Sequence, residues 1–135
     1  MLSFEKIDHV HVYVADPLAA EEWYKTVLNF HRVKGLEFWF TEGGPLIIEN
    51  GGVHLALFKS DASKSSVRTG ATVAFSTNAQ NYFEWQRQLG EQSLEFKESD
   101  HDLSWSLYFS DPDGNPYEIT TYDYNHVVQL KSKTV

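Results

Sequence analysis

The chain has 135 residues, of which 41% are apolar and 22% charged, a composition typical of one folded globular domain with a hydrophobic core. Its formal net charge of −8 disfavours nucleic acid and acidic membrane surfaces as partners, and its lack of cysteine excludes disulfides, thiolate ligands and a cysteine nucleophile. Residues 1–6 lack the long apolar run of a signal peptide, and the sequence has no run of about 18 apolar residues, so we expect a cytoplasmic protein that does not bind membranes.

The first element that the sequence predicts is a strand over residues 6–14. Apolar residues alternate with polar ones there, which is the period-two pattern of a half-buried strand. One face of this strand is therefore aliphatic. The other face carries His9, His11 and Tyr13.

A helix follows, and its start is well marked. Asp16 is a good N-cap acceptor, and Pro17 stands where the missing N–H of proline costs nothing. Apolar side chains then recur at helical spacing, at Ala20, Trp23, Tyr24, Val27 and Leu28. Asn29 stands where this helix should end.

Short strands are predicted next, near residues 30–34, 37–42 and 46–49, followed by a strand over 53–59. The segment Asn50-Gly51-Gly52 is the sharpest turn signal in the chain. The pattern leaves open whether 46–49 is a separate strand or one arm of a hairpin across that turn. In either case, His54 points away from the aliphatic face.

The second half repeats this order after a polar linker at residues 60–68. A strand is expected over 71–77, and Asn78 caps a helix that ends at Gly90. Further strands are predicted at 94–98, 104–110 and 117–122, the last two joined by a tight turn at 111–115. Two copies of a strand, a helix and three strands suggest duplication of one unit.

This order, with three local motifs, resembles the vicinal oxygen chelate superfamily, which includes glyoxalase I, bleomycin-resistance proteins and extradiol dioxygenases. The motifs are Ile7-Asp8-His9-Val10, the segment Gly52-Val53-His54-Leu55-Ala56-Leu57, and Asp111-Pro112-Asp113-Gly114-Asn115-Pro116-Tyr117-Glu118. The resemblance implies an α+β fold of two βαβββ modules, residues 5–59 and 69–123, whose sheets curl around a cavity. Residues 124–135 would then be a C-terminal tail, which either covers a partner or is disordered.

The resemblance also implies metal-ligand positions on the first and last strands of each module. These positions fall on His9, His54, Thr72 (or Ala71) and Glu118. Neither residue at the third position is a usual ligand, whereas extradiol dioxygenases have a histidine there. Two imidazoles and one carboxylate form a facial triad that suits Fe(II), Mn(II), Ni(II) or Zn(II) and leaves positions open for substrate.

Catalytic roles are expected for Glu118, for His11 and for Tyr13. His11 would act beside His9 as an outer-sphere donor or as a substitute ligand. Tyr108 and Tyr122 are additional candidates for hydrogen-bond donors or general acids. Each group also has a purely structural interpretation, since a histidine on a strand face is more often a solvent or core residue than a ligand, and a glutamate there can be an ion-pair partner. The remaining histidines are interpreted as surface residues, namely His31, His101 and His126.

The function that follows from the resemblance is a divalent-metal-dependent enzyme acting on a small molecule with vicinal oxygens, by dioxygenase or lyase–isomerase chemistry. The alternative is a metal-free, resistance-type protein that binds a small molecule or an antibiotic. The missing third ligand, an aromatic content of 15% and the acidic surface, which suits a cationic ligand, favour the alternative. The resemblance further implies a homodimer.

Overall fold

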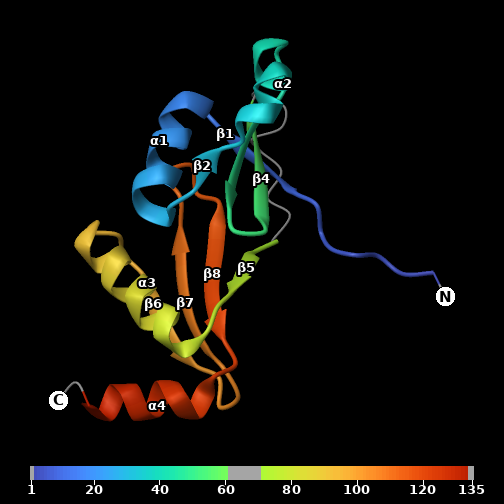
Figure 1. The fold of residues 1–135 in the computed structure, drawn as a ribbon. Coiled ribbons are helices and arrows are strands. Elements are labelled where there is room, and N and C mark those ends of the chain that lie inside the picture. Colours follow the sequence, from blue (N-terminus) through green and yellow to red (C-terminus); the bar gives the residue numbers. More distant parts are fainter. Residues whose placement is uncertain (1, 61–70, 134–135) are drawn as a thin grey trace. The chain divides into compact units, whose positions relative to one another are not determined.

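A computed structural model describes residues 2–60 and 71–133. The chain divides into two compact units, Met1–Arg68 and Thr69–Val135, and each is described by itself (Figure 1). All of the predicted linker except Ser60 lies outside the described residues. Within the described ranges, no helix combines the length and the apolar character needed to cross a membrane.

The first unit is a four-stranded mixed sheet with the helices on its connections. Its elements are β1 (Val10–Val14), α1 (Pro17–Leu28), β2 (His31–Arg32), the 3-10 turn η1 (Lys34–Leu36), α2 (Glu37–Thr41), β3 (Leu46–Asn50) and β4 (Val53–Lys59). The strand order is β1-β4-β3-β2, in which β1 runs parallel to β4 and the other pairs are antiparallel. The predicted order of one strand, a helix and three strands is confirmed.

Helix α1 begins and ends at the residues that the sequence predicts. The Asp16 side chain accepts hydrogen bonds from the backbone N–H groups of Leu18 (3.0 Å) and Ala19 (3.4 Å), which would otherwise have no partner in the first turn. Asn29 ends the helix in the left-handed conformation, with φ of 57°. The helix buries an apolar face on the sheet, at Pro17, Ala20, Tyr24, Val27 and Leu28.

A hairpin joins β3 to β4 and answers the question that the sequence leaves open. Asn50 pairs with Val53 across the turn, and Gly51 has φ of 60°, which glycine adopts without strain. The register then places Glu49 opposite His54. Residues 46–49 are thus both a strand and a hairpin arm.

Two predicted strands of the first unit differ from the structure. Residues 37–42 are wrongly predicted as a strand: α2 forms there, contacts β3 and makes local bonds such as Glu42 N–H to Phe38 O instead of adding a strand beside β2. The first strand begins at Val10 rather than at residue 6, and its pairing with β4 begins at Val10 and Leu55. Residues 2–9 leave the sheet as an exposed extended segment (Figure 1).

The second unit repeats the topology of the first. Its elements are β5 (Val73–Ser76), α3 (Ala79–Glu91), β6 (Lys97–Asp100), β7 (Trp105–Ser110), β8 (Pro116–Thr121) and α4 (Tyr124–Lys133). The strand order is β5-β8-β7-β6, and β5 runs parallel to β8 as β1 does to β4. Asn78 caps α3 as predicted, accepting from the backbone N–H of Asn81 at 2.8 Å. Two matching four-stranded sheets with helices confirm the α+β class.

The turn before β8 is a tight structural turn, as predicted. The side chain of Asp111, which is 5% exposed, accepts hydrogen bonds from the backbone N–H groups of Asp113 (2.9 Å) and Asn115 (2.8 Å). Gly114 lies between them with φ of 88°. This turn fixes where β8 starts, and therefore which face of the sheet Glu118 occupies.

Most of the residues expected to form a tail make helix α4, drawn in red in Figure 1. Val127 is fully buried, so the helix has an apolar anchor within its unit. Lys131 Nζ lies 2.8 Å from Glu98 Oε1, and the Tyr124 hydroxyl donates to Asp100 Oδ2 at 2.9 Å. The hydrogen bond to Asp100 raises the pKa of Tyr124 above its ordinary value. Tertiary contacts of this kind convert a weakly patterned segment into an ordered helix.

Candidate functional site

His9, which immediately precedes β1, and His11, on β1, form a close pair. His9 Nε2 and His11 Nε2 are 3.0 Å apart, and the two rings are nearly parallel, with centroids 5.0 Å apart and planes at 21°. His9 Nδ1 donates to Asp8 Oδ2 at 2.8 Å. This hydrogen bond from His9 lowers the pKa of Asp8 below its usual value. Because the proton of a neutral His9 is then on Nδ1, its Nε2 carries a lone pair.

The same face of β1 continues with aromatic packing. The His11 ring lies 4.5 Å from the Phe58 ring of β4, and the Tyr13 ring lies 5.6 Å from it, measured between centroids. His11 is exposed and Tyr13 is half-buried, whereas Val12 and Val14 are buried on the opposite face. The predicted division of this strand into an aliphatic and a polar–aromatic face is therefore observed.

His54 lies on the polar–aromatic face, next to Glu49 of the hairpin. Its Nε2 is 3.0 Å from Glu49 Oε2, and its side chain is 24% exposed. Its Nδ1 is buried and has no hydrogen-bond partner among the described residues. A buried polar atom without a partner normally costs free energy, so this lone nitrogen calls for an explanation.

Glu118 lies on β8 of the second unit, within a cluster of hydroxyl groups. The Ser106 hydroxyl donates to Glu118 Oε2 at 2.6 Å, and Ser106 itself is fully buried. Thr120 Oγ1 is 3.1 Å from Ser106 Oγ and donates to the Trp105 carbonyl at 3.2 Å. One carboxylate oxygen of Glu118 is thus oriented by a buried serine, which restricts the direction of the other oxygen.

The other predicted positions of the second unit differ in their surroundings. Thr72 and Ala71 are exposed and precede β5. Tyr108 pairs with Glu118 in the sheet register, and its hydroxyl is 2.9 Å from His101 Nε2. Tyr122, in contrast, is 75% exposed and follows the end of β8. Tyr108 therefore shares a sheet face with Glu118.

The predicted ligands belong to different units: His9 and His54 to the first, and Glu118 to the second. Within residues 2–60 and 71–133, no three histidine, cysteine, aspartate or glutamate side chains are grouped closely enough to hold a metal ion. Of the predicted site residues, His9 and His11 are the two whose ring nitrogens lie within hydrogen-bonding distance of each other. The three histidines expected on the surface are exposed, namely His31, His101 and His126.

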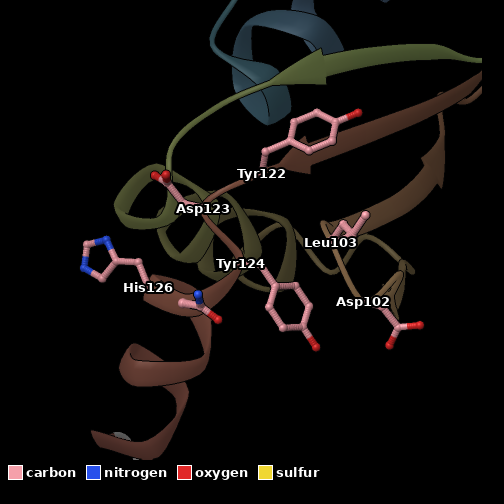
Figure 2. A pocket seen from close by; sticks show the side chains of 7 residues that line it. Asp102, Leu103, Tyr122, Asp123, Tyr124 and His126 are labelled. Atoms are coloured by element: carbon pink, nitrogen blue, oxygen red, sulfur yellow. The ribbon is translucent and has the colours of Figure 1, made fainter.

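A separate hollow of about 450 Å³ lies in the second unit (Figure 2). It contains none of the predicted ligands. Leu103 and Tyr122 line it and are both largely exposed. Its other lining residues are Asp102, Asp123, Tyr124, Asn125 and His126.

Three side chains that orient the predicted ligands were missed by the sequence interpretation. Asp8 is adjacent to His9, so its contact was open to prediction from their neighbouring positions. Glu49 follows from the hairpin, because a turn at 50–53 places residue 49 opposite residue 54. Ser106 had no sequence signal, because its contact with Glu118 depends on the pairing of β7 with β8.

Comparison with known proteins identifies the fold family. Residues 6–119 match the family described as Glyoxalase/Bleomycin resistance protein/Dioxygenase superfamily. No curated protein matches the sequence. The family match covers both units and includes all three predicted ligands.

Solved structures of similar fold cover nearly the whole chain. A glyoxalase family protein from Bacillus anthracis has a TM-score of 0.70 at 20% identity, over 90% of this chain and 98% of that one. A glyoxalase/dioxygenase from Nostoc punctiforme has a TM-score of 0.68 at 21% identity, over 87% and 91%. The fosfomycin resistance protein FosX of Listeria monocytogenes, solved with Mn(II) and sulfate, has a TM-score of 0.66 at 15% identity, over 96% and 99%. At these identities the likeness shows a shared fold.

Proposed function

Because this chain belongs to the Glyoxalase/Bleomycin resistance protein/Dioxygenase superfamily, we propose that it is a divalent-metal-dependent enzyme whose substrate is a small molecule with vicinal oxygens. The reaction is of the dioxygenase or the lyase–isomerase kind. A structural neighbour supports the choice of substrate class: FosX of Listeria monocytogenes has been solved with Mn(II) and 1S,2S-dihydroxypropylphosphonic acid, in which two hydroxyl groups are adjacent.

The observation that carries this proposal is the state of His54. With its Nε2 against the Glu49 carboxylate, the ring proton is held on Nε2, and the buried Nδ1 has an unused lone pair. A carboxylate that orients a ligating imidazole in this way is the usual arrangement around protein-bound metals. The buried Nδ1 of His54 destabilises a protein that binds no cation, because it has no hydrogen-bond partner. A bound cation would supply that partner.

His9 and Glu118 have matching arrangements. Asp8 holds the Nδ1 proton of His9, so that Nε2 has the lone pair, and Ser106 holds one oxygen of Glu118. The donor set of imidazole nitrogens and a carboxylate without thiolate suits Mn(II), Fe(II), Ni(II) or Zn(II). The side chains proposed as ligands therefore have donor atoms suited to a divalent cation: His9 and His54 in the first unit, and Glu118 in the second.

The chain's own side chains then bind and orient the substrate. A bound divalent cation supplies Lewis-acid stabilisation of negative charge on the substrate oxygens, or brings dioxygen to the site. Tyr13 offers a hydroxyl for hydrogen bonding to a substrate oxygen, from a ring packed on Phe58. Glu118, held at one oxygen by Ser106, offers the other to a cation or to a proton. The Phe58 ring gives the substrate an apolar surface.

The test is an equilibrium titration with Mn(II), followed by electron paramagnetic resonance of the free ion. We expect saturable binding to the wild-type protein and a loss of affinity of about tenfold or more in His54→Ala and Glu118→Gln, since even changes to residues that only orient ligands have effects of about this size. His101→Ala is the matched control, because His101 is exposed and hydrogen-bonded to Tyr108.

The alternative function, metal-free binding of a small molecule or antibiotic, is favoured by Thr72 at the position where a third ligand is expected. Under this alternative, the wild-type protein binds no Mn(II), Fe(II), Ni(II) or Zn(II). His54→Ala and Glu118→Gln then behave like His101→Ala in every titration. That result would overturn the metal-dependent proposal.

A further inference from the structure

We propose that the hollow in the second unit is a binding site for an organic cation, namely an ammonium ion with an aromatic or aliphatic body. The hollow has a volume of about 450 Å³, which lies within the range of about 300–1,000 Å³ for small-molecule sites. This inference goes beyond the proposed function and does not depend on it, because none of the predicted metal ligands lines the hollow.

Large side chains with apolar surface line the hollow and lie outside the hydrophobic core. Leu103, in the loop between β6 and β7, is 79% exposed, and Tyr122, which follows β8, is 75% exposed. The ring of Tyr124 lines the same hollow. Exposed apolar side chains that gather around a concave surface are typical of a ligand site, where they give the body of a ligand its contact area.

The charged lining residues are acidic. Asp102 and Asp123 lie on opposite sides of Tyr124 in Figure 2, and none of the lining residues is a lysine or an arginine. The Asp102 carboxylate forms no ion pair with any described residue. The pKa of Tyr124 is raised by its hydrogen bond to Asp100 and, to a smaller extent, by the negative charge of Asp102. A positively charged ligand is therefore complementary to the hollow.

The lining favours an organic ammonium ion over a metal ion. Within residues 2–60 and 71–133, no three histidine, cysteine, aspartate or glutamate side chains are grouped closely enough to hold a metal. An ammonium group, in contrast, is attracted by carboxylates and by the faces of tyrosine rings alike. Tyr122 and Tyr124 offer such rings, and Leu103 offers an apolar contact to the rest of the ligand.

The two walls of the hollow are the loop at residues 101–104 and the junction of β8 with α4, and both are held in place. A backbone hydrogen bond of 2.9 Å joins the ends of the loop. Asp123 Oδ2 accepts from the backbone N–H of Ala79 at 3.0 Å, which ties the junction to α3. The Tyr124 hydroxyl donates to Asp100 at 2.9 Å and connects the walls to each other. A ligand therefore meets a largely preformed surface, as in most small-molecule sites.

The experiment titrates the protein with benzyltrimethylammonium, a quaternary ammonium ion with a phenyl ring, and follows the backbone amide signals by proton–nitrogen NMR. Benzyl alcohol is the matched neutral probe. The variants are Asp102→Asn and Tyr122→Ala. The control is Glu95→Gln, which removes an exposed carboxylate of the second unit outside the hollow. The amide spectrum also checks that each variant is folded.

We expect saturable shifts of the amides at 101–104 and 122–126, and weaker binding of benzyl alcohol. Asp102→Asn and Tyr122→Ala should each lower the affinity by up to about fivefold, the size of an exposed charge pair or cation–π contact. Glu95→Gln should keep the wild-type affinity. Raising NaCl from about 20 mM to about 500 mM should weaken binding to the wild-type protein.

The proposal is wrong if benzyl alcohol binds as tightly as the cation, or if Asp102→Asn and Tyr122→Ala titrate like Glu95→Gln. Two further results would overturn it. The same shifts with Ca(II) would show that the hollow responds to charge alone, and shifts that depend on protein concentration would show that a second copy of this chain occupies it. The metal-dependent function is tested separately, by the Mn(II) titration.

Discussion

Replacement of Tyr82 by phenylalanine tests the network that ties helices α3 and α4 to the second sheet. Tyr82 is fully buried, and its hydroxyl donates to Glu98 Oε2 at 2.6 Å, while Lys131 binds the other oxygen of Glu98 at 2.8 Å. A hydrogen bond to a charged group contributes about 1.5–3 kcal/mol. Because Lys131 still pairs with Glu98 in the variant, we expect a loss near the lower end, about 1.5 kcal/mol.

The pH dependence of the same variant gives an independent readout. Burial, and then the hydrogen bond to Glu98, raise the pKa of Tyr82 far above its ordinary value of 10.0. A group whose pKa is raised on folding stabilises the protein below its unfolded pKa, and this stabilisation is lost as the pH rises toward the folded value. Between about pH 8 and pH 11, wild-type protein should therefore lose more stability than Tyr82→Phe.

The assay is urea unfolding followed by circular dichroism at both pH values, since a change in midpoint at constant slope reports stability. The two proteins differ only at residue 82, so the difference between their losses isolates Tyr82. Tyr122→Phe is the matched control, because Tyr122 is 75% exposed. Equal stability of Tyr82→Phe and wild type, or identical losses at high pH, would refute the reasoning.

Other predictions concern the first helix, the turn before β8 and the orientation of Glu118. Asp16→Ala removes the cap of α1 and should cost about 1 kcal/mol of unfolding free energy, measured by urea denaturation, whereas an unchanged midpoint would contradict the capping role. Gly114→Ala places a side chain at φ of 88° and should cost about 1–2 kcal/mol in the same assay. Ser106→Ala removes the donor to Glu118 and should weaken Mn(II) binding about tenfold, and equal affinity would show that Ser106 does not orient the carboxylate.

Features that depend on neighbouring residues were predicted well. The Asp16 cap, the helix end at Asn29 and the turn after Asp111 are each determined by a few adjacent side chains and their backbone hydrogen bonds. The face of β1 that carries His11 and Tyr13 follows from the two-residue period of a strand, which any sheet preserves.

Features that depend on contacts between residues far apart in the chain were not predicted well. Residues 37–41 contain aromatic residues suited to a strand, but no neighbouring strand is available beyond β2, and the segment is helical. Helix α4 was expected as a tail, because its pattern is weak, and the buried Val127 and the Lys131–Glu98 contact that hold it join residues far apart in the chain.

The sequence by itself therefore determined the repeated α+β topology, the family and the sheet faces of the candidate ligands, because periodicity and turn chemistry are local. Only the tertiary structure decided which ring nitrogen of each histidine has a carboxylate beside it and which is left without one. Glu49 leaves Nδ1 of His54 without a partner, and Asp8 leaves Nε2 of His9 facing His11. The physical reason is that a ring proton is positioned by the carboxylate that packing places beside it, and the position of that carboxylate depends on strand register and side-chain rotation rather than on residue type alone.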